Sequence, residues 1–200
     1  YYSDAKTIYK IESTTADFIH IDLMDGGFVP KRNFLMNDIL RLFKNHELPL
    51  DIHLMVLDPI LYIEDLASLK PHNITFHVEA TKDIIRTIEM IKRKNIKVGL
   101  AIKPNTSLLE LMPYLSFIDL VLIMSVEPGE GGQKFIDSSI SRLKELIEIR
   151  NNNNLDFLIS MDGGINNTVI KELEGLDIAV VGSYICKSNN YQDQINTLKE

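Results

Sequence analysis

The chain has 200 residues, of which 45% are apolar and 24% are charged, so it can bury a substantial core but is short for two full-sized domains. Its 21 basic and 28 acidic residues give a net charge of −7, which excludes the broad basic surface that non-specific nucleic-acid binding needs. The single cysteine, Cys186, excludes a disulfide framework and a multi-thiolate metal site. We expect one domain, residues 1–200, that binds a small ligand.

No apolar segment approaches the roughly 18 to 20 residues that span a bilayer. The start of the chain, residues 1–10, lacks the basic and then apolar pattern of a signal peptide. We therefore expect a cytoplasmic protein with neither a membrane nor a nucleic acid as its partner.

In chain order, a helical segment is predicted first, at about residues 4–13. Short apolar, β-branched runs then recur along the chain, and stretches of helical period lie between them, such as residues 84–91 and 140–147. The Asn-rich residues 151–154 are predicted to end a helix. The seven candidate strands are residues 18–23, 50–56, 74–78, 98–102, 120–124, 157–161 and 178–181.

Strict alternation of apolar strands with helices predicts a parallel sheet covered by helices, either doubly wound or closed as a (β/α)8 barrel. A barrel has eight strands and typically about 250 residues, whereas seven strands are found here and the chain is shorter. The shortfall lies at the front. We expect a (β/α)8 barrel whose first strand is truncated or missing, so that either Tyr1 to Ser3 form a stunted strand or the barrel is open beside its site.

Polar side chains cluster where the predicted strands end, which is where parallel α/β proteins carry their functional groups. His20 and Asp22 share one face of their strand, His53 lies in the next strand, and Asp162 follows a later one. A divalent metal would satisfy all four, and a ligand set of imidazole and carboxylate suits Zn(II), Fe(II), Mn(II) or Co(II). The alternative is a hydrogen-bonded His–Asp network without a metal.

Glycine-rich loops follow three of the strands. Glycine lets a ligand approach the backbone closely and exposes N–H groups that can bind an anion. The loops after the last two strands are the usual position of phosphate in barrels, so we predict a phosphate site there. The loops contain Gly129, Gly131, Gly132 and Gln133, then Gly163 and Gly164, then Gly182 and Ser183.

These segments resemble the ribulose-phosphate 3-epimerase family. The matching stretches follow the order of the family from about residue 17 to residue 188, and together they are highly specific. They read HIDLMDGGFVP at 20–30, DIHLMV at 51–56, FHVEA at 76–80, VLIMSVEPG at 121–129, GGQKF at 131–135, DGGI at 162–165 and VGS at 181–183.

The resemblance implies a (β/α)8 barrel, one catalytic divalent metal, and interconversion of D-ribulose 5-phosphate and D-xylulose 5-phosphate through an enediolate. It implies His20, Asp22, His53 and Asp162 as metal ligands, with Asp22 and Asp162 as the two acid/base carboxylates. It also suggests a homo-oligomer, a dimer or larger. The implied substrate- and phosphate-binding residues are His53, Met24, Met55, Met124, Gly129, Gly131, Gly132, Gln133, Asp162, Gly163, Gly164, Gly182 and Ser183.

His77 and Glu79 share a face of one predicted strand and are candidates for orienting the ligands. The chain departs from the family pattern at Gly27, Lys31 and Glu130, where the family usually has His, Asn and an aromatic residue. These changes leave the sugar open, so a 3-epimerase of a hexulose 6-phosphate such as allulose 6-phosphate is an alternative. A non-catalytic sugar-phosphate-binding barrel is another. A metal-free decarboxylase on a related barrel would use a lysine at a strand end, and none is identified there.

Overall fold

A computed structural model describes residues 5–33 and 35–199 of the chain. Its seven strands are all parallel and form one sheet in which each strand pairs with the next along the chain. This is a (β/α)8-type barrel sheet, and every strand lies within about a residue of its predicted bounds. The strands are β1 (Ile19–Met24), β2 (Leu50–Met55), β3 (Asn73–His77), β4 (Lys97–Ile102), β5 (Leu120–Met124), β6 (Leu158–Asp162) and β7 (Ile178–Val180).

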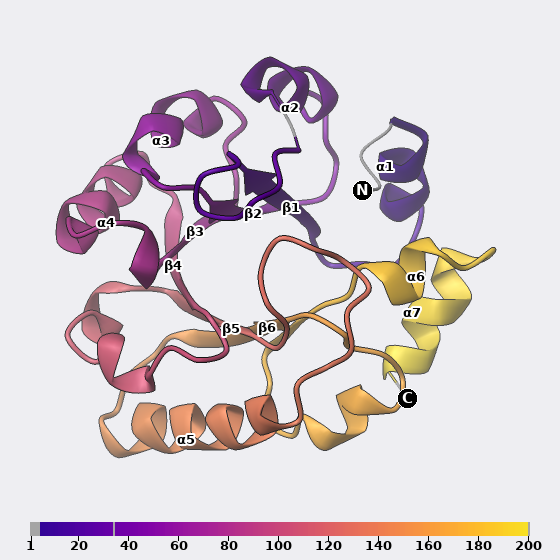
Figure 1. Cartoon of the computed structure of the whole chain (residues 1–200). Helices are drawn as coiled ribbons and strands as arrows, with labels where there is room; N and C mark the ends of the chain where they lie inside the picture. The colour runs from indigo at the N-terminus through magenta and orange to yellow at the C-terminus, as the bar shows by residue number, and fades with distance from the viewer. Residues whose placement is uncertain (1–4, 34, 200) are drawn as a thin grey trace.

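Helices surround the sheet, as Figure 1 shows for the arc from α2 to α5. The predicted alternation is wrong at two connections. Only short 3₁₀ turns, Leu108–Glu110 and Leu115–Phe117, join β4 to β5, and the turn Val169–Glu172 stands alone between β6 and β7. The α-helices are α1 (Ala5–Glu12), α2 (Met36–Leu42), α3 (Ile60–Ala67), α4 (Ile84–Lys92), α5 (Ser138–Asn152), α6 (Ser183–Cys186) and α7 (Tyr191–Lys199), and one more 3₁₀ turn, Val78–Ala80, follows β3.

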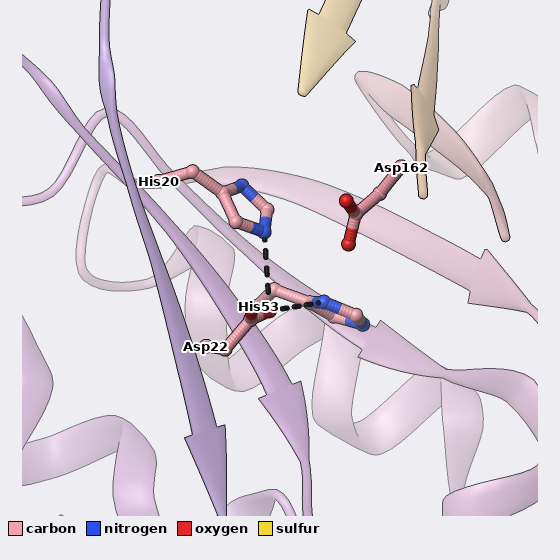
Figure 2. Close-up of side chains that lie close together, drawn as sticks. All are labelled: His20, Asp22, His53 and Asp162. Carbon is pink, nitrogen blue, oxygen red and sulfur yellow. Dashed lines mark hydrogen bonds and ion pairs between the residues drawn. The ribbon is translucent and has the colours of Figure 1, made fainter. Parts of the chain in front are cut away.

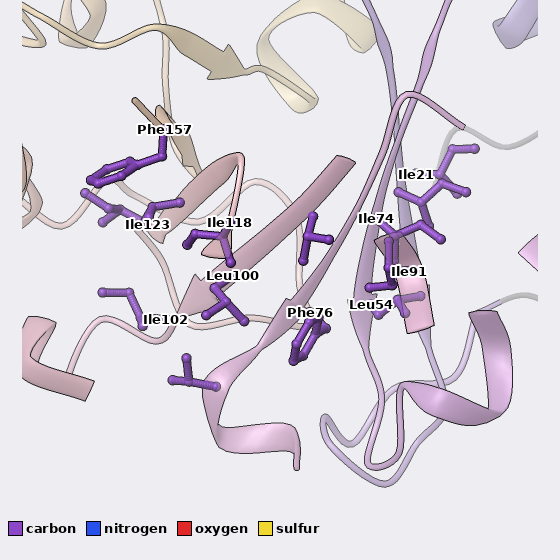
Figure 3. Close-up of a cluster of buried hydrophobic side chains, with 14 of the residues drawn as sticks. Ile21, Leu54, Ile74, Phe76, Ile91, Leu100, Ile102, Ile118, Ile123 and Phe157 are labelled. Carbon is purple, nitrogen blue, oxygen red and sulfur yellow. The ribbon is translucent and has the colours of Figure 1, made fainter. Parts of the chain in front are cut away.

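The main core lies between the sheet and the helices. Alternate strand residues, such as Leu54, Phe76 and Leu100, face outward and are completely buried under helix residues such as Ile91 (Figure 3). The strand residues between them face the barrel interior, where polar groups and a smaller apolar cluster lie. Because most of the buried apolar side chains lie on the outer face of the sheet, the inner face can hold polar side chains that act on a ligand.

The sheet of the described residues is open, because β1 and β7 stand at its two ends and each pairs on one side only. A cavity of about 830 Å³ lies along this seam and is lined by residues of both edge strands, among them Ile19, Ile21 and Ile178. Tyr1 to Ser3, predicted as a possible stunted strand, lie outside the described residues. The described residues thus leave the sheet open at this seam.

The register of the sheet sets side by side residues that were predicted to act together. Asp22 is paired with His53 across β1 and β2, and Met124 is paired with Asp162 across β5 and β6. Because paired residues of parallel strands point to the same face, all four project into the barrel interior at the carboxyl end of the sheet.

Among the helices of the described residues, none is both long and apolar enough to cross a membrane.

Candidate metal centre and active site

Four side chains from three strands converge at the carboxyl end of the sheet. His20 and Asp22 come from β1, His53 comes from β2, and Asp162 is the last residue of β6. One nitrogen or oxygen from each lies within 4.8 Å of the others. Figure 2 shows Asp162 facing the other three from the opposite side of the site. The structure brings together the four residues that the sequence singled out, and their role as ligands stays a prediction.

His20 is held between two carboxylates. Its Nε2 lies 3.2 Å from Asp22 Oδ1, inside the cluster, and its Nδ1 lies 2.6 Å from Asp51 Oδ2, outside it. Asp51 is buried, and its other oxygen accepts a hydrogen bond from the side-chain amide of Asn73. Although burial alone would lower the pKa of His20, Asp51 and then Asp22 raise it well above 6.5. Sequence reasoning missed Asp51, although the period of two placed it on the same face as His53.

His53 is completely buried and is also bonded on both ring nitrogens. Its Nδ1 lies 3.0 Å from Asp22 Oδ1, and its Nε2 lies 2.9 Å from His77 Nε2. The other ring nitrogen of His77, Nδ1, lies 3.1 Å from Glu79 Oε2. Burial lowers the pKa of His77 to about 4, so this ring is neutral at pH 7. Of the two residues predicted to orient ligands, His77 contacts the cluster directly through His53, and Glu79 contacts His77.

The two aspartates of the cluster have opposite electrostatic environments. Burial alone would raise the pKa of Asp22, but hydrogen bonds from His20 and His53 outweigh it and lower that pKa far below the usual range. Burial and then the charge of Asp22 raise the pKa of Asp162 above its usual value. Two carboxyl groups whose environments separate their pKa values can serve as a base and an acid in one site.

The donor set fits a divalent metal ion. Two imidazole nitrogens flank one carboxylate oxygen at 3.2 and 3.0 Å, a spacing at which all three can reach one cation, and a second carboxylate faces them. The outward ring nitrogens of His20 and His53 are each bonded to a partner, as is typical of metal-ligating histidines. With no thiolate present, the chemistry of the set suits Zn(II), Fe(II), Mn(II) or Co(II).

The seam cavity opens onto this cluster, since His20, Asp22 and Asp162 line it. Three methionines predicted to contact the substrate, Met24, Met55 and Met124, line the same cavity, although each is 3% exposed or less. Met24 and Met55 are paired across β1 and β2 and pack with Val29 and Phe28 of the loop that follows β1. The methionines therefore form an apolar wall next to the polar cluster.

The predicted glycine loops also meet at this cavity. Gly163 and Gly164 have φ values of 120° and 68°, and a Cβ on either would lie 2.4 Å from a neighbouring atom, so both positions require glycine. The amide nitrogen of Gln133, Nε2, donates to two carbonyl oxygens of its own loop. The lining residues from these loops are Gly129, Gly131, Gly132, Gln133, Gly163, Gly164, Gly182 and Ser183.

Lys187, which sequence reasoning missed, lines the same cavity. Its Nζ is close enough to the glycine loop that a Cβ placed on Gly132 would lie 3.4 Å from it. Lys187 comes directly after α6, four residues beyond Ser183 of the predicted phosphate loop. One helical turn therefore places Lys187 on the same side of α6 as Ser183. The spacing from Ser183 was the available signal.

Two further positions noted in the sequence, Gly27 and the lysines at strand ends, are located by the structure. At Gly27, a Cβ would lie 2.6 Å from Leu57 Cδ1, so Leu57 occupies the space into which a side chain at this position would project. Lys103 directly follows β4, so the statement that no lysine stands at a strand end is wrong. The Lys103 amine lies over the ring of Phe28, 4.1 Å from its centroid.

A parallel barrel sheet whose strand ends carry a convergent His–carboxylate cluster defines a barrel enzyme with a site able to hold a metal ion. A family profile described as the ribulose-phosphate 3 epimerase family matches residues 1–186. The ribulose-phosphate 3-epimerase of Aquifex aeolicus is 40% identical over 186 residues, covering 92% of this chain and 84% of that protein. The enzyme of the same name from Helicobacter pylori (strain 26695) is 38% identical over 195 residues, covering 95% and 89%. The chain therefore belongs to the ribulose-phosphate 3-epimerase family and is an isomerase.

The fold is shared more widely. A crystal structure of KGPDC from Streptococcus mutans superposes with a TM-score of 0.69 at 17% identity, covering 98% of this chain and 91% of that one. At this level of identity the likeness concerns the fold alone.

Proposed function

We propose that this protein is a metal-dependent epimerase that interconverts D-ribulose 5-phosphate and D-xylulose 5-phosphate by proton transfer at C3. The observation that carries the proposal is the opposition of Asp22 and Asp162 across one cluster, with their pKa values displaced in opposite directions. Inverting a carbon centre needs one group to remove a proton and a second to deliver one to the other face. A binding module would have no use for such a pair.

His20, Asp22, His53 and Asp162 would hold the metal, and their donor atoms fit it. A divalent ion there would supply positive charge next to the oxygens of the substrate, which stabilises an enediolate. The residues move the protons. An ionised carboxylate on one side of the sugar takes the C3 proton, and the carboxyl group on the other side gives its proton to the opposite face of C3. The two aspartates exchange these roles when the reaction runs in reverse.

The surroundings of the cluster support the same chemistry. Met24, Met55 and Met124 present polarizable, apolar side chains that exclude water from the carbanionic intermediate. The glycine loops around Gly132, Gly163 and Gly182 offer backbone N–H groups to the phosphate, and the amine of Lys187 adds positive charge on that side of the cavity.

Solvent-deuterium exchange at C3 of D-ribulose 5-phosphate tests the proposal. The purified chain is incubated with the sugar in D₂O, with and without prior removal of metal by a chelator. We expect exchange and epimerisation in the presence of a divalent ion and neither after chelation. Absence of exchange with every one of Zn(II), Fe(II), Mn(II) and Co(II) would refute the epimerase. Exchange that survives complete chelation would refute the metal.

A hexulose 6-phosphate is the alternative substrate. The presence of Gly27, where the family usually has a histidine, supports this alternative. Leu57, and not a histidine, fills the space beside position 27 in the loop that covers the site. The discriminating measurement is the ratio of kcat/KM for D-ribulose 5-phosphate to that for D-allulose 6-phosphate. We expect the pentulose to be preferred at least tenfold, and a ratio below one would transfer the assignment to the hexulose.

We also propose that the enzyme acts in the cytoplasm as a homo-oligomer. Large apolar side chains stand exposed on α3 and beside it, with Leu61 72% exposed and Leu57 58% exposed, which is consistent with a contact between subunits. Light scattering at micromolar concentration tests the assembly, and a monomer at every concentration would contradict it.

A further inference from the structure

A chain of contacts leads outward from the candidate metal ligand His53 to the loop that follows β4. His53 Nε2 lies 2.9 Å from His77 Nε2, and His77 Nδ1 lies 3.1 Å from Glu79 Oε2. The other oxygen of Glu79 accepts hydrogen bonds from the backbone N–H of Lys103, at 2.9 Å, and from the hydroxyl of Thr106. His53 and His77 are both completely buried, so no water competes for their ring nitrogens.

Glu79, the last residue of this series of contacts, determines which ring nitrogen of His77 and of His53 carries a proton. Glu79 is a carboxylate that already accepts two hydrogen bonds, so it accepts from His77 as well, and the proton of the His77 ring lies on Nδ1. A neutral imidazole with its proton on Nδ1 has a lone pair on Nε2. That lone pair faces His53 Nε2, which must therefore donate. A neutral His53 then carries its lone pair on Nδ1, the nitrogen that would meet a metal ion.

His53 Nδ1 is the nitrogen that faces the cluster, 3.0 Å from Asp22 Oδ1. A metal ion takes the unprotonated nitrogen of an imidazole, so the tautomer that Glu79 imposes through His77 is the one that ligation requires. We propose that His77 and Glu79 are positioning residues that fix the tautomer and the ring orientation of His53 for metal binding. The inference rests on the metal site of the proposed function and adds residues that do not themselves touch the metal or the substrate.

The packing around His77 holds its ring in the plane that these bonds need. The ring of Phe28, in the loop that follows β1, lies against it with the two centroids 4.7 Å apart, and the amine of Lys103 lies over the Phe28 ring. The loop that covers the methionine wall therefore contacts the same histidine that orients the ligand.

The test compares three single variants of the full chain. His77→Leu removes the acceptor for His53 Nε2. His77→Gln keeps the polarity, because its amide oxygen can accept from His53 while its NH₂ group donates to Glu79. Phe76→Leu, at the neighbouring position that faces the helices, is the matched control for loss of packing in the same strand. The readouts are the Kd for Zn(II), by competition with a chromophoric chelator, and the visible absorption spectrum of the Co(II)-loaded protein.

We expect His77→Leu to weaken Zn(II) binding at least tenfold and to change the Co(II) spectrum, in line with typical losses on removing such partners. His77→Gln should stay within about threefold of the wild type, and Phe76→Leu should lower thermal stability without moving the Kd. An unchanged Kd in His77→Leu overturns the positioning role and leaves the epimerase standing. A wild-type chain that binds no divalent metal overturns the metal site and the positioning role together.

Nitrogen NMR of the Zn(II)-loaded wild-type protein provides a readout that does not depend on any variant folding. Two-bond ¹⁵N–¹H correlations of the imidazole rings report which nitrogen carries the proton. We expect His53 and His77 to be protonated on Nε2 and Nδ1, respectively. The opposite tautomer at His53 would overturn the proposal.

Discussion

The side chain of Asn33 occupies the place of a strand partner next to Asp22. Its Nδ2 donates to the backbone carbonyl of Asp22 at 2.6 Å, and its Oδ1 accepts from the backbone N–H of Met24 at 2.9 Å. These two groups belong to β1, the strand at the open edge of the sheet. One amide therefore satisfies two backbone groups of the edge strand beside a candidate ligand.

Replacing Asn33 with Ala should leave both backbone groups without this partner. We expect the free energy of unfolding to fall by about 1–3 kcal/mol and kcat to fall with it, because Asp22 is less firmly placed. Urea unfolding and steady-state kinetics measure the two effects. Asn33→Asp retains the acceptor for the Met24 N–H but loses the donor to the Asp22 carbonyl. Its free energy of unfolding should therefore lie between those of the wild type and Asn33→Ala. Wild-type stability in Asn33→Ala would show that solvent replaces the amide at no cost.

Asp51 holds the outward nitrogen of His20 and should be needed for tight metal binding. In Asp51→Asn, the amide must accept from His20 and also face the donor of Asn73, so one of the two bonds is lost. We expect about a tenfold weaker Kd for Zn(II) and a lower pKa of His20 in the metal-free protein. Chelator competition and an NMR titration measure these effects.

Asp119→Asn is the matched control for that experiment. The Asp119 carboxylate accepts from the backbone of Val98 at the amino-terminal end of β4, away from the cluster. Its replacement should leave the Kd for Zn(II) unchanged. An equal loss in both variants would mean that general destabilisation, and not the bond to His20, is responsible.

Asp162→Asn should abolish turnover while leaving the fold intact. The carboxamide cannot take up or deliver a proton, so kcat should fall at least about 10³-fold. Burial raises the pKa of Asp162, which shows that its ionised form is disfavoured in the folded protein, so a neutral replacement should not lower the free energy of unfolding. Kinetics and urea unfolding test the two statements. Activity near that of the wild type would contradict the assignment of two carboxylates.

Metal affinity should rise with pH across the neutral range. Without a metal, burial and the charge of Asp22 raise the pKa of Asp162 to about 6, and Asp51 and Asp22 raise the pKa of His20 well above 6.5, so Asp162 carries a proton in acid solution and His20 carries one at neutral pH. Binding must displace these protons, so affinity increases as the pH rises and levels off above the higher of the two pKa values. Each displaced proton contributes up to about tenfold per pH unit. Chelator competition from pH 5.5 to 8.5 measures the slope, and a flat profile would refute the prediction.

Lys187 should contribute to binding of the substrate phosphate and not to proton transfer. In Lys187→Met, we expect KM to rise about tenfold with kcat nearly unchanged, because the charge acts equally on substrate and transition state. Salt should raise KM less in this variant than in the wild type. Lys92→Met, on the outer surface of α4, is the control and should have no effect. A drop in kcat without a change in KM would contradict the role.

The strands, the barrel class and the four cluster residues could all be predicted from the order of the residues. Strands with β-branched residues on alternate positions have few ways to bury them, and parallel strands bring their carboxyl ends to one edge, so His20, His53 and Asp162 could be grouped before any coordinates. Short apolar segments between β4 and β5 gave no comparable signal, and helices were expected there in error.

The surroundings of the cluster, by contrast, became visible only in three dimensions. The contacts of Asn33 with Asp22, of Asp51 with His20 and of His77 with His53 depend on register, rotamer and loop path, which local periodicity does not encode. The opposite displacement of the pKa values of Asp22 and Asp162 likewise arises from burial and from neighbours on other strands. Local pattern specifies which face a residue occupies, whereas its partners are fixed by the packing of segments distant in the chain.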